Sequence, residues 1–222
     1  MGLVLSTCTK LTDIYLRQKV MNEEEIVDVA PAISRLLSYH PHLVKIGLKG
    51  FQLAGTFASS PLPPVKNLRL RRCTFADEDW NIMANRSDLS FTTLGVSSYF
   101  EDIHFPSFCS FLVNQAPTLE MLGLEFPTLT VEEICKILRI MAKFNKLRTL
   151  ELACTEETDF ANIEKIIIDM MSINSSRMLR VEIQSDADAS DIIQVLNRVR
   201  EVISKSCKVN RRPPIGVLIC YD

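Results

Sequence analysis

The feature that most constrains the fold is a short apolar motif that recurs along the whole chain of 222 residues. The motif reads apolar-x-x-apolar-x-apolar, and seven clear copies are followed by a weaker eighth. A repeated spacing of this kind is typical of architectures in which every unit buries its apolar face against its neighbours. The copies are Leu11-Ile14-Leu16, Leu43-Ile46-Leu48, Val65-Leu68-Leu70, Phe91-Leu94-Val96, Leu119-Leu122-Leu124, Leu147-Leu150-Leu152, Met178-Val181-Ile183 and, more weakly, Pro214-Val217-Ile219.

The residues between the motifs predict helices. Apolar residues recur there at steps of three and four, which places them on one face of a helix. Asn22-x-x-Glu25 and Thr130-x-x-Glu133 have the form of capping boxes, which begin helices. Residues 50–64 are rich in glycine and proline, so that connection is expected to be extended or turn-like. Helices are expected over 22–40, 130–143, 160–173 and 190–206, with shorter ones over 77–85 and 107–115.

A short strand and a helix repeated at this period resemble the leucine-rich-repeat superfamily, most closely the helix-containing repeats of ribonuclease inhibitor and of F-box proteins. Residues 65–73, with Leu68, Leu70 and Cys73, come nearest to the LxxLxLxxC form of that family. The resemblance implies an α/β solenoid with a curved parallel sheet on the concave side and helices on the convex side. The ninth position of other copies departs from Cys or Asn and holds Phe51, Tyr99 or Pro127.

The same resemblance implies a single domain over 1–222 with about seven to eight irregular repeats. Terminal repeats of such proteins need polar caps, and neither end of this sequence has the character of one. We therefore expect the chain to be a piece of a longer protein. Met1-Gly2 with Ser6 fits a myristoylation pattern. The phase of the first repeat favours the alternative that these residues end a truncated helix.

Charge and cysteine usage narrow the class of partner and the compartment. The net charge of −2 supplies no broad positive field, so we expect no nucleic-acid partner. Seven scattered cysteines without a CxxC motif are typical of a reduced protein of the cytoplasm or nucleus. No apolar run reaches the roughly 18 residues that a membrane span requires.

The motifs of common catalytic chemistry are absent from the sequence. It contains no GxGxxG, GxxxxGK[ST], HExxH or GxSxG, and its seven glycines leave little material for phosphate-binding loops. His40 and His42 flank Pro41 and suit a surface turn better than a metal site. Asp186-x-Asp188 begins like a calcium loop, but Asp191 stands where that loop requires glycine. We expect no enzymatic activity, cofactor, metal or small-molecule substrate.

Function is expected on the side of the sheet that faces away from the helices. In a leucine-rich-repeat strand, the third, fifth and seventh residues of each unit point to the concave surface. These positions are basic in units one to three and acidic in units five to seven, so this surface should be bipolar. An ordinary solvated sheet face is the open alternative. The predicted partner-binding residues are Tyr15, Arg17, Lys45, Lys49, Arg69, Arg71, Met121, Glu125, Glu151 and Glu182.

Glycine occupies the central, fifth position of three units, as Gly47, Gly95 and Gly123. Because glycine weakens a strand, its repetition at one position indicates either crowding by a neighbouring side chain or close approach of a ligand backbone. The leading hypothesis is a protein–protein interaction module, with the substrate receptor of a ubiquitin ligase as the setting that the family resemblance offers. The alternative is a structural or assembly subunit whose solenoid ends or convex face pack within a larger complex.

Overall fold

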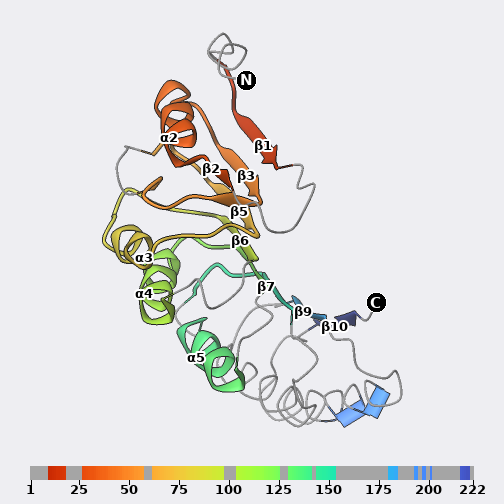
Figure 1. Ribbon diagram of the computed structural model, residues 1–222. Coiled ribbons are helices and arrows are strands. Elements are labelled where there is room, and N and C mark those ends of the chain that lie inside the picture. The colour runs from red at the N-terminus through yellow and green to blue at the C-terminus, as the bar shows by residue number, and fades with distance from the viewer. Residues whose placement is uncertain are drawn as a thin grey trace.

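The computed structural model describes residues 10–18, 27–57, 62–97, 104–125, 130–141, 144–153, 180–184, 193–194, 197–198, 201 and 216–220. Within these ranges, eight strands form one sheet in which each neighbouring pair is parallel (Figure 1). Their order in the sheet follows their order in the chain. The strands are β1 (Asp13–Arg17), β3 (Lys45–Lys49), β5 (Asn67–Arg71), β6 (Thr93–Ser97), β7 (Met121–Glu125), β8 (Thr149–Ala153), β9 (Arg180–Gln184) and β10 (Gly216–Cys220).

The register of the sheet confirms the phase of the repeat. Each strand covers the third to seventh residues of one motif, and the weak eighth copy also forms a strand. The central apolar residue of every motif lies opposite that of the next motif. This row runs Ile14, Ile46, Leu68, Leu94, Leu122, Leu150, Val181 and Val217.

Main-chain hydrogen bonds repeat at the point where the chain enters each strand. The carbonyl oxygen of Thr12, the second residue of the first motif, accepts hydrogen bonds from the amides of Val44 and Lys45 at 2.7 and 3.0 Å. The same bifurcated arrangement recurs at the carbonyls of Val44, Lys66, Thr92 and Glu120, each with two amides of the following repeat. Neighbouring repeats are therefore joined by the same contact from β1 to β8.

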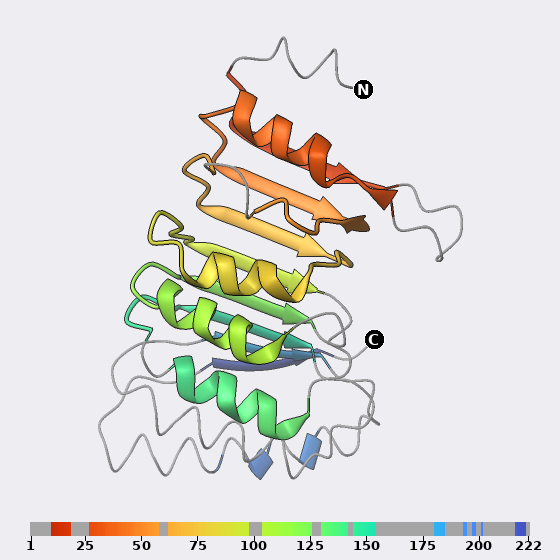
Figure 2. The same ribbon diagram turned by 60° about the vertical axis from the view of Figure 1, so that its left-hand side comes forward.

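Four helices cover one face of the sheet, and the opposite face carries none of the described helices (Figure 2). Figure 1 shows that the sheet bends along an arc with these helices on its outer side. The fold is thus α/β, with a parallel sheet that alternates with helices, as predicted. The helices are α2 (Ala30–Tyr39), α3 (Asp77–Ala84), α4 (Phe105–Gln115) and α5 (Val131–Met141).

The expected helix over 22–40 is wrong at its beginning. Val27 and Asp28 form the short strand β2, which pairs in parallel with β4 (Phe51–Gln52), and the helix begins only at Ala30. Pro31 lies in its first turn, where the missing amide hydrogen is not needed. The proposed cap at Asn22–Glu25 lies outside the described residues.

The other predicted helices agree with the structure where it describes them. The helices expected over 130–143, 107–115 and 77–85 are found as α5, α4 and α3, and α5 begins with the predicted cap. The Glu133 carboxylate accepts hydrogen bonds from the Thr130 amide and hydroxyl at 2.9 and 2.8 Å. Residues 193–194, 197–198 and 201 are helical, within the expected 190–206. Residues 160–173 lie outside the described ranges.

The glycine- and proline-rich connection after β3 contains no helix in its described part. Gly50 and Gly55 have φ angles of 79° and 76°, which favour glycine because a Cβ would be strained there. The expectation for His40 is wrong: its side chain is buried at the end of α2, whereas His42 is exposed as expected.

The core lies between the sheet and the helices. Alternate strand residues point toward the helix layer, so Leu68, Leu94, Leu122 and Leu150 have at most 1% of their surface exposed. Aromatic residues fill the space beneath α3 and α4, where the ring of Trp80 lies 4.9 Å from that of Phe108. Cys73, Cys109 and Cys135 are buried cysteines in the thiol form. Burial raises the pKa of Cys109 to about 11, so this thiol is protonated at neutral pH.

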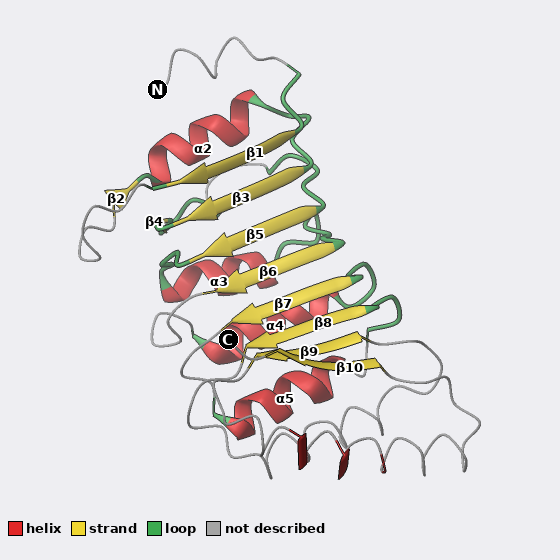
Figure 3. Cartoon of the chain, turned by 90° about the vertical axis from the view of Figure 1, so that its right-hand side faces the viewer, coloured by secondary structure: helices red, strands yellow, loops and turns green. Residues whose placement is uncertain are grey.

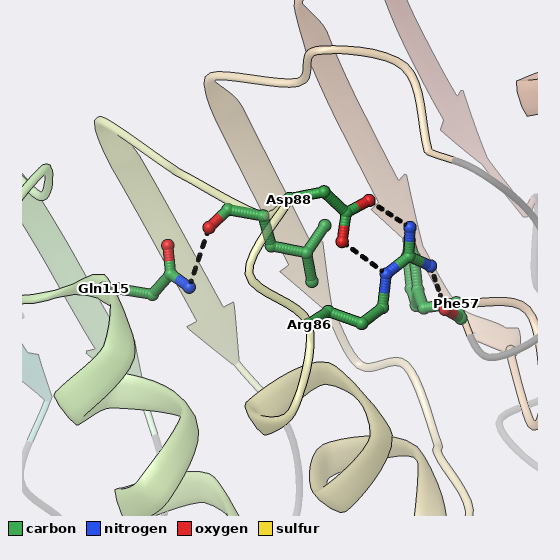
Figure 4. Close-up of polar contacts among 5 residues, drawn as sticks. Phe57, Arg86, Asp88 and Gln115 are labelled. Atoms are coloured by element: carbon green, nitrogen blue, oxygen red, sulfur yellow. Dashed lines mark hydrogen bonds and ion pairs between the residues drawn. The ribbon is translucent and has the colours of Figure 1, made fainter.

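Buried and half-buried polar side chains tie the loops of neighbouring repeats together (Figure 4). The Gln115 amide in α4 accepts a hydrogen bond from the Phe91 amide at 3.0 Å and donates to the Leu89 carbonyl at 3.4 Å. The Arg86 guanidinium pairs with Asp88 and donates to the Phe57 carbonyl at 2.9 Å. These contacts hold the loop before β6 against Phe57 of the preceding repeat and against α4 of the following one.

Candidate functional site

The candidate site lies on the helix-free face of the sheet, which is turned toward the viewer in Figure 3. Because side chains alternate along a strand, the third, fifth and seventh residues of the motifs point to this face wherever the structure describes their side chains. They form three rows across the sheet. The central row runs Tyr15, Gly47, Arg69, Gly95, Gly123, Glu151 and Glu182.

An open groove with a volume of about 280 Å³ crosses the middle of this face. It is lined by β5, β6, β7 and β8, together with Tyr15 from β1. Six of the ten predicted binding residues line it, whereas Arg17, Lys45 and Lys49 stand outside it and the side chain of Glu182 lies outside the described part. The six are Tyr15, Arg69, Arg71, Met121, Glu125 and Glu151.

The basic side of the face is partly neutralised by contacts within the protein. Lys45 lies 3.0 Å from the Asp13 carboxylate, and both side chains are exposed. Hydrogen bonds from Lys45 and from the Thr12 hydroxyl hold the pKa of Asp13 below its usual value. Arg17 is exposed and Lys49 half-buried. Lys45 thus already has an anionic neighbour within its own repeat pair, at a shorter distance than the 3.9 Å between Arg71 and Glu125.

Arg69 and Arg71 form the cationic wall of the groove. Both are exposed on β5, with the aliphatic stem of Arg69 beside Gly95 on the next strand. The Arg71 guanidinium reaches across β6 to within 3.9 Å of the Glu125 carboxylate. Exposed ion pairs of this kind contribute only about 0–1 kcal/mol, because water screens them. A partner can therefore exchange with either charge at little cost.

Glu125 and Glu151 form the anionic wall of the groove. Glu125 is exposed on β7 and Glu151 is half-buried on β8, with its carboxylate leaning over Gly123. Glu182 lies beside Glu151 in the register of β8 and β9. The predicted bipolar arrangement is therefore present along β5 to β8, and the Arg71–Glu125 ion pair marks the point where the two charges meet.

The three glycines of the central row differ in what surrounds them. A Cβ on Gly47 would lie 2.3 Å from the Tyr15 ring, so the ring covers this glycine. A Cβ on Gly95 would be 3.6 Å from the Arg69 stem, an ordinary contact. A Cβ on Gly123 would be 3.3 Å from the movable Glu151 carboxylate. The fold thus accounts for the glycine at position 47 but not for those at 95 and 123.

Two hydroxyl-bearing residues of the groove lining, Thr93 and Ser97, are not among the predicted binding residues. They flank Gly95 on β6, and both are half-buried on the groove side. Their position in the motif carries the same signal as that of the predicted residues, but their small uncharged side chains gave no reason to select them. Tyr15, with 61% of its surface exposed, closes one end of the groove.

A histidine and a serine lie in contact at the start of α4. The His104 Nδ1 lies 2.6 Å from the Ser107 hydroxyl, which donates a hydrogen bond to the Asn81 side chain at 2.6 Å. Because the hydroxyl proton is directed at the Asn81 oxygen, the His104 tautomer with a proton on Nδ1 completes this arrangement by donating to the serine. Ser107 is also only 3% exposed, so the contact serves the start of α4.

Other site types find no support in the part of the chain that the structure describes. There, no three His, Cys, Asp or Glu side chains gather as a possible metal site. None of the helices in those ranges has the length and apolar character needed to cross a membrane. Comparison of the chain with family models, with curated proteins and with solved structures finds no match.

Proposed function

We propose that the chain is a leucine-rich-repeat solenoid that binds a protein partner on the helix-free, concave face of its sheet. The parallel sheet in chain order, the single helix layer and the carbonyl that receives two amides in successive repeats support the solenoid. Each inner strand of the sheet pairs with the strands of the repeats before and after it, as expected of a quasi-one-dimensional architecture. The motif resembles the helix-containing class of these repeats.

The observation that carries the binding role is the groove with a cationic and an anionic wall at the centre of this face. Arg69 and Arg71 stand on one side, and Glu125 and Glu151 on the other. Opposite charges separated in this way orient a partner of complementary charge and raise its association rate. Arginine is also enriched among residues that dominate the energetics of protein interfaces.

The resemblance to the repeat domains of F-box proteins suggests a setting as the substrate receptor of a ubiquitin ligase. This setting follows from the resemblance alone, because a fold by itself does not determine a function. The bound protein would then be a substrate whose charges complement the groove. The binding role on the strand face does not depend on this setting.

Charge reversal on the two faces tests the binding role. Affinity purification of the full-length protein from cells should compare the wild type with R69E/R71E, which changes the strand face. The matched control is R35E/R139E, which changes two exposed arginines of α2 and α5 by the same total charge. Quantitative mass spectrometry would measure the proteins that co-purify with each variant.

We expect R69E/R71E to lose the specific partner and R35E/R139E to keep it. The loss should shrink at high salt, where exposed charges are screened over about 10 Å or less. Both variants should keep the wild-type circular dichroism spectrum, because all four arginines are exposed. Normal binding by R69E/R71E together with loss in R35E/R139E would replace this proposal with an interface on the helix layer.

A further inference from the structure

The groove runs across the strands, from the cationic wall on β5 to the anionic wall on β7 and β8. Adjacent strands are about 4.8 Å apart, so the main chains of the strands that carry the two walls are separated by two to three strand spacings, or about 10–14 Å. The long Arg71 side chain bridges part of this distance to pair with Glu125. This separation matches two charged side chains of one bound segment. At this distance, one segment of a partner can contact both walls, and two separate regions of a folded partner are not needed.

The floor between the walls is low because of Gly95 and Gly123. These glycines are neighbours in the register of β6 and β7, and their strands carry Thr93, Ser97 and Met121 around them. Neither glycine has a positive φ angle, and a Cβ on either would meet only a movable side chain within 3.4 Å, or none. The missing side chains therefore leave room above the sheet that is bordered by the Arg69 stem and by the movable Glu151 carboxylate.

We propose that this groove holds an extended peptide segment of the partner protein. An acidic side chain of the segment lies against Arg69 and Arg71, a basic side chain lies against Glu125 and Glu151, and the segment's main chain passes over Gly95 and Gly123. The inference rests on the proposed function, since it specifies what the strand face binds. Because one wall is positive and the other negative, a segment that carries a negative and a positive side chain fits the groove better than a segment with charges of only one sign.

The separation of the walls sets the spacing of the two charges. An extended chain advances about 3.3 Å per residue, so about three or four residues span the 10–14 Å between the walls. The Arg71–Glu125 ion pair is exposed and weak, and the bound segment replaces it with one ion pair for each partner. The Thr93 and Ser97 hydroxyls, half-buried beside Gly95, can hydrogen-bond to the main chain of the segment.

Selection of random linear peptides displayed on phage, with the full chain as the target, tests the occupant. Enriched peptides should carry an acidic and a basic residue about three or four positions apart. Synthetic versions would then be measured by fluorescence anisotropy against the wild type, R69E/R71E, G95A/G123A and the control R35E/R139E. Peptides with both charged residues replaced by alanine serve as the second control.

We expect roughly tenfold or greater loss of affinity in R69E/R71E and in G95A/G123A, and wild-type affinity in R35E/R139E. Since the Gly95 site has the more open surroundings, Gly95→Ala alone carries the test if the double variant is unstable. A different result would be peptides that bind G95A/G123A as tightly as the wild type and still fail to bind R69E/R71E. This result would overturn the inference that the main chain of the segment passes over Gly95 and Gly123, but it would leave the strand face as the binding site.

Two other results separate the inference from the proposed function. Enriched peptides that lose affinity only in R35E/R139E would overturn both, because binding would then lie on the helix layer. The absence of any enriched peptide, combined with loss of the cellular partner in R69E/R71E, would overturn the extended segment and leave binding of a folded surface on the strand face.

Discussion

At the scale of single residues, glycine occurs three times in the central row of the sheet, but for two different structural reasons. Gly47 lies beneath the ring of Tyr15, which occupies the place of the missing side chain. No side chain of the described structure covers Gly95 or Gly123 as closely as the Tyr15 ring covers Gly47. Sequence position alone cannot separate these cases, because all three glycines stand at the fifth position of the motif.

The three glycines should therefore respond differently to alanine. Alanine is more stable than glycine in a strand by about 0.5–1 kcal/mol, so Gly95→Ala should raise the free energy of unfolding by about that amount. Gly123→Ala should be close to neutral, because its Cβ presses on a movable carboxylate. Gly47→Ala should lower the free energy of unfolding, because the Tyr15 ring must leave its place. Chemical denaturation measures all three.

A double-mutant cycle checks the cause assigned to Gly47. In a Tyr15→Ala background the crowding is gone, so Gly47→Ala should become neutral or stabilising. If Gly47→Ala destabilises equally in both backgrounds, the Tyr15 ring is not what requires the glycine.

At the scale of the elements, Asp79 joins helix α3 to the loop of the preceding repeat. Its side chain is 1% exposed. Both carboxylate oxygens lie 3.0 Å from the Gly55 amide, and one accepts a hydrogen bond from the Ala76 amide at 2.9 Å. A single buried carboxylate thus satisfies the start of α3 and the turn after β4 together.

Asp79→Asn should lower the free energy of unfolding by about 1–3 kcal/mol, because the new amide group faces buried N–H donors that need an acceptor. Asp88→Asn is the matched control. Asp88 pairs with Arg86 but its side chain is 55% exposed, so its loss should cost about 0–1 kcal/mol. Equal melting temperatures for the two variants would contradict the structural role of Asp79.

At the scale of the whole molecule, stability comes from contacts between consecutive repeats. The sheet order follows the chain, and the central apolar row continues from Ile14 to Val217. A defect in the middle of the row therefore weakens the contacts on both sides of it.

Leu122→Asp or Leu150→Asp should abolish the cooperative unfolding transition. Both leucines are fully buried, and a buried unpaired carboxylate costs several kcal/mol against a total stability of about 5–15 kcal/mol. Arg69→Asp places the same group on the exposed face of the sheet and should keep a cooperative transition. Circular dichroism during thermal unfolding distinguishes these outcomes, and wild-type melting of either leucine variant would mean that the apolar row is not the core.

The positions of the strands and several helices could be predicted from the sequence, because they depend on local patterns. The period of the apolar motif specifies which residues pair, and the eight described strands keep that register. The Thr130–Glu133 cap predicts the start of α5 because both partners lie within one helical turn. The helix expected over 22–40 failed at its beginning because pairing of β2 with β4, distant in sequence, decides where α2 starts.

The candidate site shows the same division between local and distant causes. Alternation along a strand predicts which side chains share the helix-free face, and in the described part Arg69, Arg71, Glu125 and Glu151 line the groove on that face. Only the tertiary structure decides that Asp13 pairs with Lys45, that Arg71 reaches Glu125, and that Tyr15 covers Gly47. These contacts join residues of different repeats, and they depend on side-chain directions and distances that a linear pattern does not contain.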